Sequence, residues 1–329
     1  MSIPTNFSGG LTVDGVSVLG GGGAIPFQFG NYYFVDATNG SDGNDGRSLL
    51  SPLKTAAQAI SLVTANNNDV VVLSGYASHS LTAMLTVPAR THLVGTGNIG
   101  ARAAQATKLS MGVTTAITDV TAVNQSGARS SISNIKIINN NTLTQSISAL
   151  KVTAEGAVLN NVNVIMPVRL DQTTVYDIIY AADSGTCTNC VFGDDVYQFS
   201  VARNVMCFGI DASTPVKDCS FINCTWKINT TTAASALIKA GGATDCVGFT
   251  NTFRNTILSA YVNANTGAVA IDAAVKMNSS TTGTLIFDAN TISAGCTKIS
   301  VATNSANNGV KVCAPVPTAA TSGISVTAA

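Results

Sequence analysis

The sequence predicts an all-β protein: a right-handed parallel β-helix with a short N-terminal capping helix and an extended N-terminal arm. Three observations carry this prediction. A strand motif, apolar-x-apolar after a polar residue, recurs every 26–29 residues, and such a period indicates stacked supersecondary units. The segments between the copies are rich in Gly, Asn, Ser and Thr, which favour turns. The copies carry no continuous helical periodicity, so repeats of paired helices are disfavoured.

Each copy of the motif is expected to fall at the same place in successive coils. A second short apolar run lies upstream of most copies, as at residues 149–152, so each repeat holds two or three short strands. Stacked strands pair in parallel about 4.8 Å apart, which builds a solenoid. The first apolar residues of the copies are Leu109, Ile135, Val162, Cys190, Cys219, Cys246, Ala273 and Ile299.

The composition divides the chain into four parts. Residues 1–30 form a glycine-rich arm, 31–75 an entry segment with the capping helix, 76–312 the coils, and 313–329 an extended tail. A lone alternating segment cannot bury its own apolar face. We therefore expect the arm to attach the protein to a partner or to intertwine with sibling chains. The residues expected to make these contacts are Leu11, Val13, Val16, Val18, Ile25, Phe27 and Phe29.

The entry segment has its own pattern. A strand at 32–36 leads into a dense turn at 39–46, and a helix is predicted over 53–63 before a buried strand at 69–75. This order resembles the entry segment of pectate-lyase-like β-helix proteins, although Asn68 stands where that family usually has Gly. The resemblance implies that the helix plugs the first coil, where an open sheet edge would invite aggregation.

With its glycine-rich arm and no visible signal peptide, the whole chain also resembles trimeric β-helix proteins that decorate the heads of tailed bacteriophages. The resemblance implies a virion structural protein: a homotrimer on the capsid surface, bound to the major capsid protein and assembled in the host cytoplasm. The alternative is a tailspike or tail fibre that binds or cleaves host surface polysaccharide. A secreted adhesin or pectin-degrading enzyme is disfavoured by the missing signal.

The charge balance and the hydropathy pattern limit the classes of partner that the chain is expected to bind. Charged residues make up only 10% of the chain, and 17 basic residues offset 17 acidic ones. Nucleic acid needs a basic stripe, so nucleic-acid binding is not expected. No apolar run approaches the roughly 18 residues of a membrane span, so no membrane partner is expected either. The 46% of hydrophobic residues must be buried within the chain or between subunits.

Catalytic candidates are few. Glycoside hydrolysis needs two carboxylates, and Glu155 is the chain's single glutamate, so a pair would have to consist of aspartates. Asp194 and Asp195 are adjacent, and neighbours on a strand point to opposite faces. Trp226 is expected to face outward or into an interface. We therefore expect no enzymatic activity and no cofactor. The remaining candidate carboxylates are Asp171, Asp177, Asp183 and Asp211.

The repeat predicts a structural role for the cysteines. Cys190, Cys219 and Cys246 are expected to stack as an internal ladder of small buried hydrophobes. The alternative is metal or redox chemistry, because Cys187 and Cys190 form a CxxC pair. One corner of the coils is expected to carry a row of hydrogen-bonding side chains: Asn134, Asn161, Asn189, Asp218, Asp245 and Asp272.

The turn of the entry segment is the one metal candidate. Asp42, Asn44 and Asp45 supply side-chain oxygens of the kind that Ca²⁺ prefers. The full twelve-residue calcium loop with its terminal Glu is absent, so a plain turn with Asx hydrogen bonds is the default interpretation. No other metal site is expected.

Overall fold

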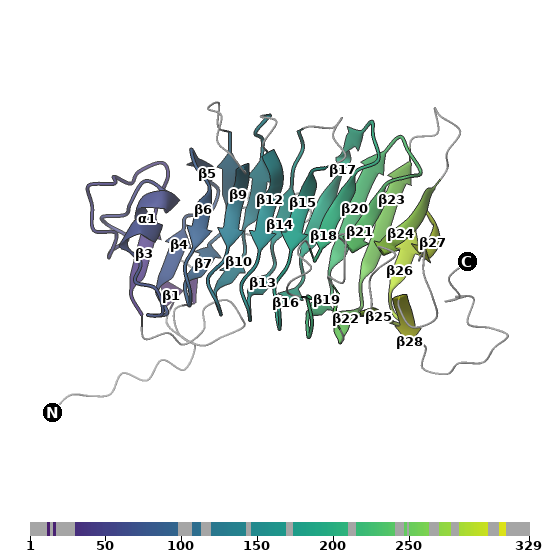
Figure 1. The fold of residues 1–329 in the computed structure, drawn as a ribbon. Coiled ribbons are helices and arrows are strands. Elements are labelled where there is room, and N and C mark those ends of the chain that lie inside the picture. Colours follow the sequence, from purple (N-terminus) through teal and green to yellow (C-terminus); the bar gives the residue numbers. More distant parts are fainter. Residues whose placement is uncertain are drawn as a thin grey trace.

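The computed structural model describes residues 12–13, 16–17, 30–97, 107–112, 120–142, 146–168, 174–209, 215–240, 247–248, 250–262, 270–277, 283–301 and 309–313. The chain winds through successive coils that stack along one axis, from the N-terminal end to the C-terminal end (Figure 1). Each complete coil contributes one strand to each of three sheets, and all pairings in these sheets are parallel. The predicted right-handed parallel β-helix is confirmed.

The first sheet has ten strands and the other two have eight each. The first sheet consists of β3 (Tyr32–Val35), β4 (Val70–Leu73), β7 (His92–Gly95), β10 (Ser131–Ser133), β13 (Val158–Asn160), β16 (Thr186–Thr188), β19 (Ser220–Ile222), β22 (Asn251–Arg254), β25 (Thr284–Asp288) and β28 (Gly309–Cys313). The second consists of β5 (Ser78–Leu81), β8 (Lys108–Met111), β11 (Lys136–Asn139), β14 (Asn163–Ile165), β17 (Val191–Phe199), β20 (Thr225–Thr230), β23 (Ile257–Val262) and β26 (Ile292–Ala294). The third consists of β6 (Leu85–Val87), β9 (Val120–Gln125), β12 (Ser146–Val152), β15 (Tyr176–Tyr180), β18 (Asn204–Phe208), β21 (Ala236–Ala240), β24 (Ile271–Met277) and β27 (Cys296–Val301).

Helix α1 (Ala56–Leu62) covers the N-terminal end of the stack, as the entry segment predicts. It is shorter than the expected 53–63 because Leu53 pairs with Val35 as an isolated parallel bridge. Thr55 caps the helix, since its hydroxyl accepts a hydrogen bond from the Gln58 amide at 3.1 Å. The buried face of the helix packs into the main core.

A second, smaller piece of structure lies in the arm. Strands β1 (Thr12–Val13) and β2 (Val16–Ser17) pair antiparallel as a hairpin that is separate from the three sheets. Val13 and Val16 are cross-strand partners in it. The other arm residues expected to make contacts, Leu11, Val18, Ile25, Phe27 and Phe29, lie outside the described residues.

The corner between the first and second sheets is a column of asparagines. Asn134, Asn161 and Asn189 take left-handed backbone angles (φ 57°, 55° and 55°), which Asn tolerates better than most residues. The Asn161 amide donates to Asn134 Oδ1 at 2.9 Å, 27 residues away. The column continues through Asn223 and Asn255, whose amides donate to the preceding Asn across 34 and 32 residues. These bonds tie the coil of Asn134 to that of Asn161, and join the coils of Asn189, Asn223 and Asn255.

The expected continuation of this corner through the aspartates is wrong. Asp218 lies at the other corner, between the third and first sheets, where it takes a left-handed φ of 56° like Arg129 and Ser184. Asp272 lies in β24, and Asp245 is outside the described residues. Beyond Asn189 the coils become longer than the 26–29-residue spacing of the motif. The copies of the motif therefore pass from the second sheet into the first.

The core runs the length of the stack as one cluster. Its C-terminal half is aromatic: Phe221 stacks on Phe253 at 4.7 Å between ring centroids, and Phe253 stacks on Phe287 at 4.4 Å. Trp226 is fully buried against Phe192 and Phe253, so its expected outward position is wrong. Among the described helices, none is long and apolar enough to cross a membrane.

Candidate functional site

The predicted carboxylates are scattered. Asp171 and Asp211 lie outside the described residues. Asp183 accepts a hydrogen bond from the Lys217 backbone amide at a coil corner. Asp177 is buried inside the coil, whereas Asp194 and Asp195 lie on strand β17 at the surface. The structure therefore offers two places to look for chemistry: the interior around Asp177 and the outer face of the second sheet.

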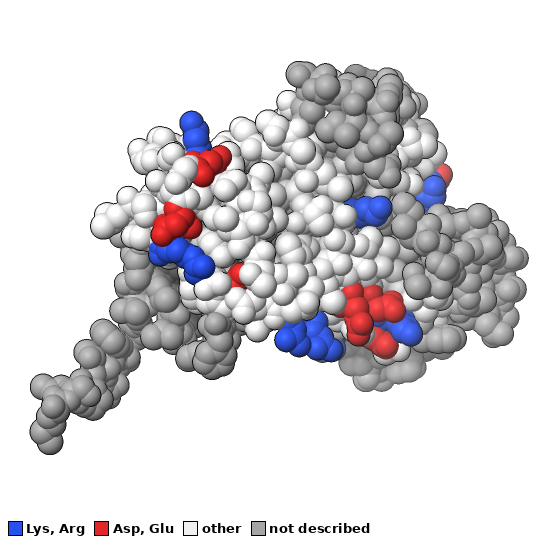
Figure 2. Space-filling model, turned by 60° about the vertical axis from the view of Figure 1, so that its left-hand side comes forward, with Lys and Arg blue, Asp and Glu red and all other residues white. Residues whose placement is uncertain are grey.

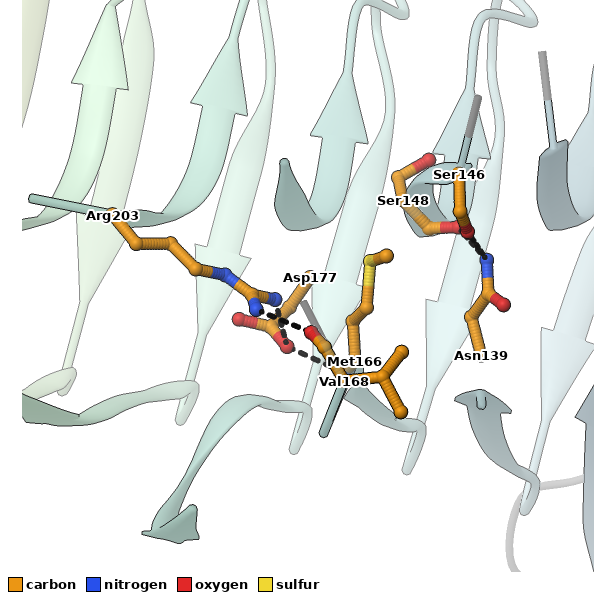
Figure 3. Close-up of polar contacts among 7 residues, drawn as sticks. All are labelled: Asn139, Ser146, Ser148, Met166, Val168, Asp177 and Arg203. Atoms are coloured by element: carbon orange, nitrogen blue, oxygen red, sulfur yellow. Dashed lines mark hydrogen bonds and ion pairs between the residues drawn. The ribbon is translucent and has the colours of Figure 1, made fainter. Parts of the chain in front are cut away.

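Asp177 pairs with Arg203 inside the coil (Figure 3). The two side chains are 2% and 0% exposed, and Arg203 Nη2 lies 3.3 Å from Asp177 Oδ1. The same carboxylate oxygen accepts a hydrogen bond from the Met166 amide, and Arg203 Nη1 donates to the Val168 carbonyl. The Arg203 guanidinium also lies over the Phe199 ring, 4.1 Å from its centroid. These contacts hold consecutive coils together where the chain passes from the second sheet to the third.

Burial dominates the electrostatics of this pair. It raises the pKa of Asp177 to about 6, although the Arg203 charge and the Met166 amide act in the opposite direction. Burial likewise lowers the pKa of Arg203, against the attraction of Asp177. Among the described residues, Asp177 Oδ2 and Arg203 Nε have no hydrogen-bond partner. A fully buried pair cannot reach a polymeric substrate, so its role is structural.

The neighbouring coil carries a neutral version of the same arrangement (Figure 3). The Asn139 amide donates to Ser146 Oγ at 3.0 Å and to the Ser148 carbonyl at 2.7 Å, and all three residues are buried. Ser148 Oγ also lies 3.0 Å from the hydroxyl of Thr121 in the coil before. The sequence motif did not indicate these buried polar side chains. They occupy positions that alternate with apolar residues in both sheets.

The outer face of the second sheet carries several half-buried charges. Lys108 and Lys136 are directly opposite each other on β8 and β11. Within the described part of the chain, no carboxylate lies within ion-pair distance of either lysine. Burial lowers the pKa of Lys136; Asp194 acts to raise it and Lys108 to lower it further. Two cations therefore stand side by side on a half-buried sheet surface.

Two strands beyond β11 in the same sheet, β17 has a bulge. Its register with β20 jumps from Asp194 to Gln198, so the ladder of paired residues passes over Asp195, Val196 and Tyr197. Gly193 precedes the bulge with a φ of +80°, and a Cβ there would lie 2.1 Å from the Lys227 carbonyl oxygen, so glycine is required. Bulges re-aim side chains and are frequent beside active sites.

The bulge presents both polar and aromatic groups. Asp195 lies 3.8 Å from Lys227 Nζ, and Asp194 Oδ1 accepts a hydrogen bond from the Val196 amide. Val196 is 63% and Tyr197 is 42% exposed. Together with Lys108 and Lys136, the residues Asp194, Asp195, Tyr197 and Lys227 make up what we call the lysine–aspartate face.

Cys190 and Cys219 are buried thiols whose register differs from the prediction. Cys190 lies beside Cys224, because Val191 pairs with Thr225, whereas Cys219 lies one sheet away beside Gly185. Cys246 is outside the described residues. Burial raises the pKa of Cys190 well above its usual value and that of Cys219 to about 11. Both thiols therefore stay protonated near neutral pH, and the thiol form is the unreactive one.

The calcium candidate forms an internally bonded turn. Asp42 Oδ1 accepts the amides of Lys54 and Thr55, and its Oδ2 accepts the Thr55 hydroxyl. Asp45 accepts the Arg47 amide, and the Asn44 side chain donates to the Pro52 carbonyl. These contacts join the turn to the start of helix α1. No group of three or more His, Cys, Asp or Glu side chains among the described residues is arranged to hold a metal.

Comparison with known proteins identifies the fold. No family model matches the sequence, and no curated protein matches it. A pectate lyase, Pel9A, is similar with a TM-score of 0.53 and 11% identity, over 86% of this chain and 68% of that one. The pectin methylesterase of Aspergillus niger is similar with a TM-score of 0.52 and 14% identity, over 89% of this chain and 88% of that one. A tailspike capsular polysaccharide depolymerase from Acinetobacter baumannii bacteriophage Fri1 has a TM-score of 0.44 and 12% identity, over 74% of this chain and 50% of that one.

These comparisons correct the expectation that the chain is not an enzyme. That expectation rested on the shortage of carboxylates and on assigning the coils a purely structural role. Pectate lyase and pectin methylesterase are enzymes, and both share this architecture over most of the chain. The fold is thus one on which enzymes are built. The chain is a right-handed parallel β-helix whose fold is similar to that of pectate lyase and pectin methylesterase.

Proposed function

We propose that the lysine–aspartate face binds an acidic polysaccharide. The observation that carries the proposal is the register of Lys108 and Lys136, which are directly opposite each other without an ion-pair partner in the described chain. Like charges opposite each other destabilise a sheet. A carboxylate, sulfate or phosphate group on a sugar, lying across both lysines, removes that repulsion.

The rest of the face suits a chain of sugars. Tyr197 offers a half-exposed ring, whose apolar surface can lie against the C–H groups of a pyranose. Asp195 and Lys227 supply hydrogen-bonding groups on the same side of the sheet. The carboxylates within reach of such a glycan are Asp194 and Asp195, and these two residues are the candidates for general acid and base if the glycan is cleaved.

The proposal predicts that Lys136→Ala weakens binding to an acidic polysaccharide by about tenfold, and that Lys108→Ala/Lys136→Ala weakens it further. Affinity electrophoresis or calorimetry with polygalacturonate, and with neutral dextran as reference, measures this change. Lys151→Ala is the matched control, because Lys151 is a half-buried lysine on the third sheet whose cross-strand partners, Asn124 and Ile179, are uncharged. Equal loss in the control, or unchanged affinity in the double variant, contradicts the proposal.

Cleavage of the polysaccharide is measured in the same samples. Release of reducing ends indicates hydrolysis, and absorbance from unsaturated products indicates a lyase. Asp194→Asn and Asp195→Asn are expected to abolish whichever product forms while leaving binding within about threefold of the native affinity. If products still form in both variants, neither aspartate acts as the general acid or base of the reaction.

A second candidate function is a structural role in a bacteriophage particle: a homotrimeric capsid decoration protein, held to the major capsid protein by its N-terminal arm. One observation favours association with other chains. Large apolar side chains gather on the outer face of the second sheet in its last coils, where Ile257, Tyr261 and Ile292 are 41%, 59% and 59% exposed. Exposed apolar patches of this kind commonly mark interfaces. On the face seen in Figure 2, charged groups are sparse and broad neutral areas lie between them.

This candidate predicts that the full chain sediments as a trimer and that Ile257→Lys/Ile292→Lys sediments as a monomer. Burying two lysines in an apolar interface costs several kcal/mol, which is enough to separate the subunits at micromolar concentration. Analytical ultracentrifugation makes the measurement. Val158→Lys, at a 38% exposed position on the first sheet, is the control and should leave the trimer intact. A native chain that is monomeric at high concentration rules out the trimer.

A further inference from the structure

The outer face of the first sheet is covered at its N-terminal end. Val70, Val72 and Val94 alternate along their strands with Val71, Leu73 and Leu93, which face the main core. They form a separate apolar cluster on the opposite side of the sheet. Their exposed fractions are nevertheless only 0%, 5% and 1%. Outward side chains of a sheet are this well buried only when another segment lies on them.

The cover ends further along the sheet. Val158 occupies the same outer column as Val70, three strands away through His92 and Ser131, and it is 38% exposed. The covered area therefore spans β4, β7 and β10 and has ended by β13. Tyr32 and Phe34 on β3 pack against its edge. We call this area the outer valine patch.

A histidine lies within the patch. His92 is 6% exposed, and its Nδ1 lies 2.8 Å from Ser131 Oγ. Its Nε2 is buried and has no partner among the described groups. Burial lowers the pKa of this ring. A buried ring nitrogen of this kind normally has a hydrogen-bond partner, so the segment on the patch is expected to offer a backbone or side-chain group to it.

The described elements do not account for the cover. The strands in extensive contact with β4 are β3 and β7, its neighbours in the same sheet. Helix α1 also contacts β4, but the buried residues of the helix belong to the main core, on the other side of the sheet. The covering segment therefore comes from a part of the same chain outside these elements.

We infer that the outer valine patch is the docking surface for the arm of the same chain, residues 11–29. The arm joins the sheet at the right place: Gly30 packs so closely on Asn68 that a Cβ would lie 2.2 Å from its carbonyl oxygen, and the Asn31 amide donates to Asp69. From there, nineteen residues can reach roughly 60 Å when extended. The patch is only about 10 Å wide across three strands.

The composition of the arm fits this surface. Residues 11–29 carry one charged side chain, Asp14, and eight large apolar ones: Leu11, Val13, Val16, Val18, Leu19, Ile25, Phe27 and Phe29. The competing segment nearby, residues 98–106, contains Arg102 and a single large apolar residue, Ile99. Hairpin β1–β2 gives the arm an antiparallel unit that can lie on a sheet as an extra layer. The inference does not rest on either proposed function.

Hydrogen exchange of the full chain tests the docking. Amides of residues 11–29 are expected to exchange at least about tenfold more slowly than in a free peptide of the same sequence. Val72→Glu places a charge under the arm and should abolish that protection. Val158→Glu, in the uncovered part of the sheet, should retain it. Unprotected amides in the native chain overturn the inference.

A variant in the arm distinguishes release of the arm from misfolding of the sheet. Phe27→Asp leaves the patch intact and is expected to release the arm, so that the His92 pKa, followed by NMR, rises toward its ordinary value as water reaches the ring. A His92 pKa unchanged in Phe27→Asp, together with protection of residues 98–106, assigns the cover to that loop and overturns the inference. If the protection of residues 11–29 falls on dilution, the cover comes from the arm of a second copy, and the inference is overturned as well.

Discussion

Replacing Arg203 with Met is expected to lower the free energy of unfolding by about 3–5 kcal/mol. Arg203 is fully buried, and its guanidinium is 3.3 Å from the equally buried Asp177. Methionine fills most of the same volume but leaves the carboxylate without its cation, in a place that water does not reach. Urea unfolding of both proteins at pH 7, followed by far-UV circular dichroism, measures the difference.

The double variant Asp177→Asn/Arg203→Met separates pairing from packing. Replacing a buried ion pair with uncharged groups of similar size is often nearly neutral. The double variant should therefore recover most of the stability that Arg203→Met loses. If it is as unstable as the single variant, the loss comes from packing against Phe199, and the ion pair has no special role.

The pH dependence gives an independent check. The pKa of Asp177 is about 6 in the folded chain, against 3.8 for the ordinary carboxyl group. A raised pKa means that the folded chain binds the proton more tightly, so this group stabilises the fold more as the pH falls from about 6 to about 4. That contribution is lost as the pH rises through 6. Asp177→Asn should remove the slope, and Arg203→Met should extend it toward neutral pH, because the pKa of Asp177 then rises further.

Replacing Phe253 with Ala is expected to cost about 3–5 kcal/mol, comparable to the loss of Arg203. Phe253 lies in the middle of the aromatic core, stacked between Phe221 at 4.7 Å and Phe287 at 4.4 Å, with Trp226 at 5.6 Å. Removing its ring opens a cavity that three coils share, and stacked strands cannot close it without breaking their register. The shift of the urea midpoint measures the loss.

Two further variants make the test of Phe253 specific. Phe253→Leu keeps most of the volume and should cost under about 1.5 kcal/mol. Tyr261→Ala removes an aromatic ring that is 59% exposed and should change the stability by less than about 0.5 kcal/mol. A loss for Tyr261→Ala equal to that for Phe253→Ala would mean that the outer ring is buried in the assembled protein. Unchanged stability of Phe253→Ala would contradict the aromatic core.

The entry segment was predictable because its signals are local. Thr55 caps the helix through a residue three positions away, and the turn at Asp42 bonds to the backbone of residues 54 and 55. Turn propensity and capping depend on nearby residues, so they can be read from a short stretch of sequence. The Asn134–Asn161–Asn189 column was also predictable, because those coils keep an almost constant length.

The candidate site was not predictable in the same way. Asp194 and Asp195 were recognised only as a pair of adjacent carboxylates, and Lys108 and Lys136 were not singled out. Their proximity depends on the parallel register of four strands and on the bulge that ends at Gln198. A bulge changes which residues face outward, and the sequence pattern of β17 does not reveal where it lies.

The sequence by itself determined the class of fold, the parallel stacking and the capped N-terminal end, since these follow from motif period, turn chemistry and local capping. Only the tertiary structure decided the register beyond Asn189, the burial of Trp226, the pairing of Asp177 with Arg203 and the place of Cys219. The physical reason is that all three sheets use the same alternation of inward and outward residues. A repeated motif therefore identifies a strand but not its sheet, and corner loops of variable length let the pattern pass from one sheet to the next.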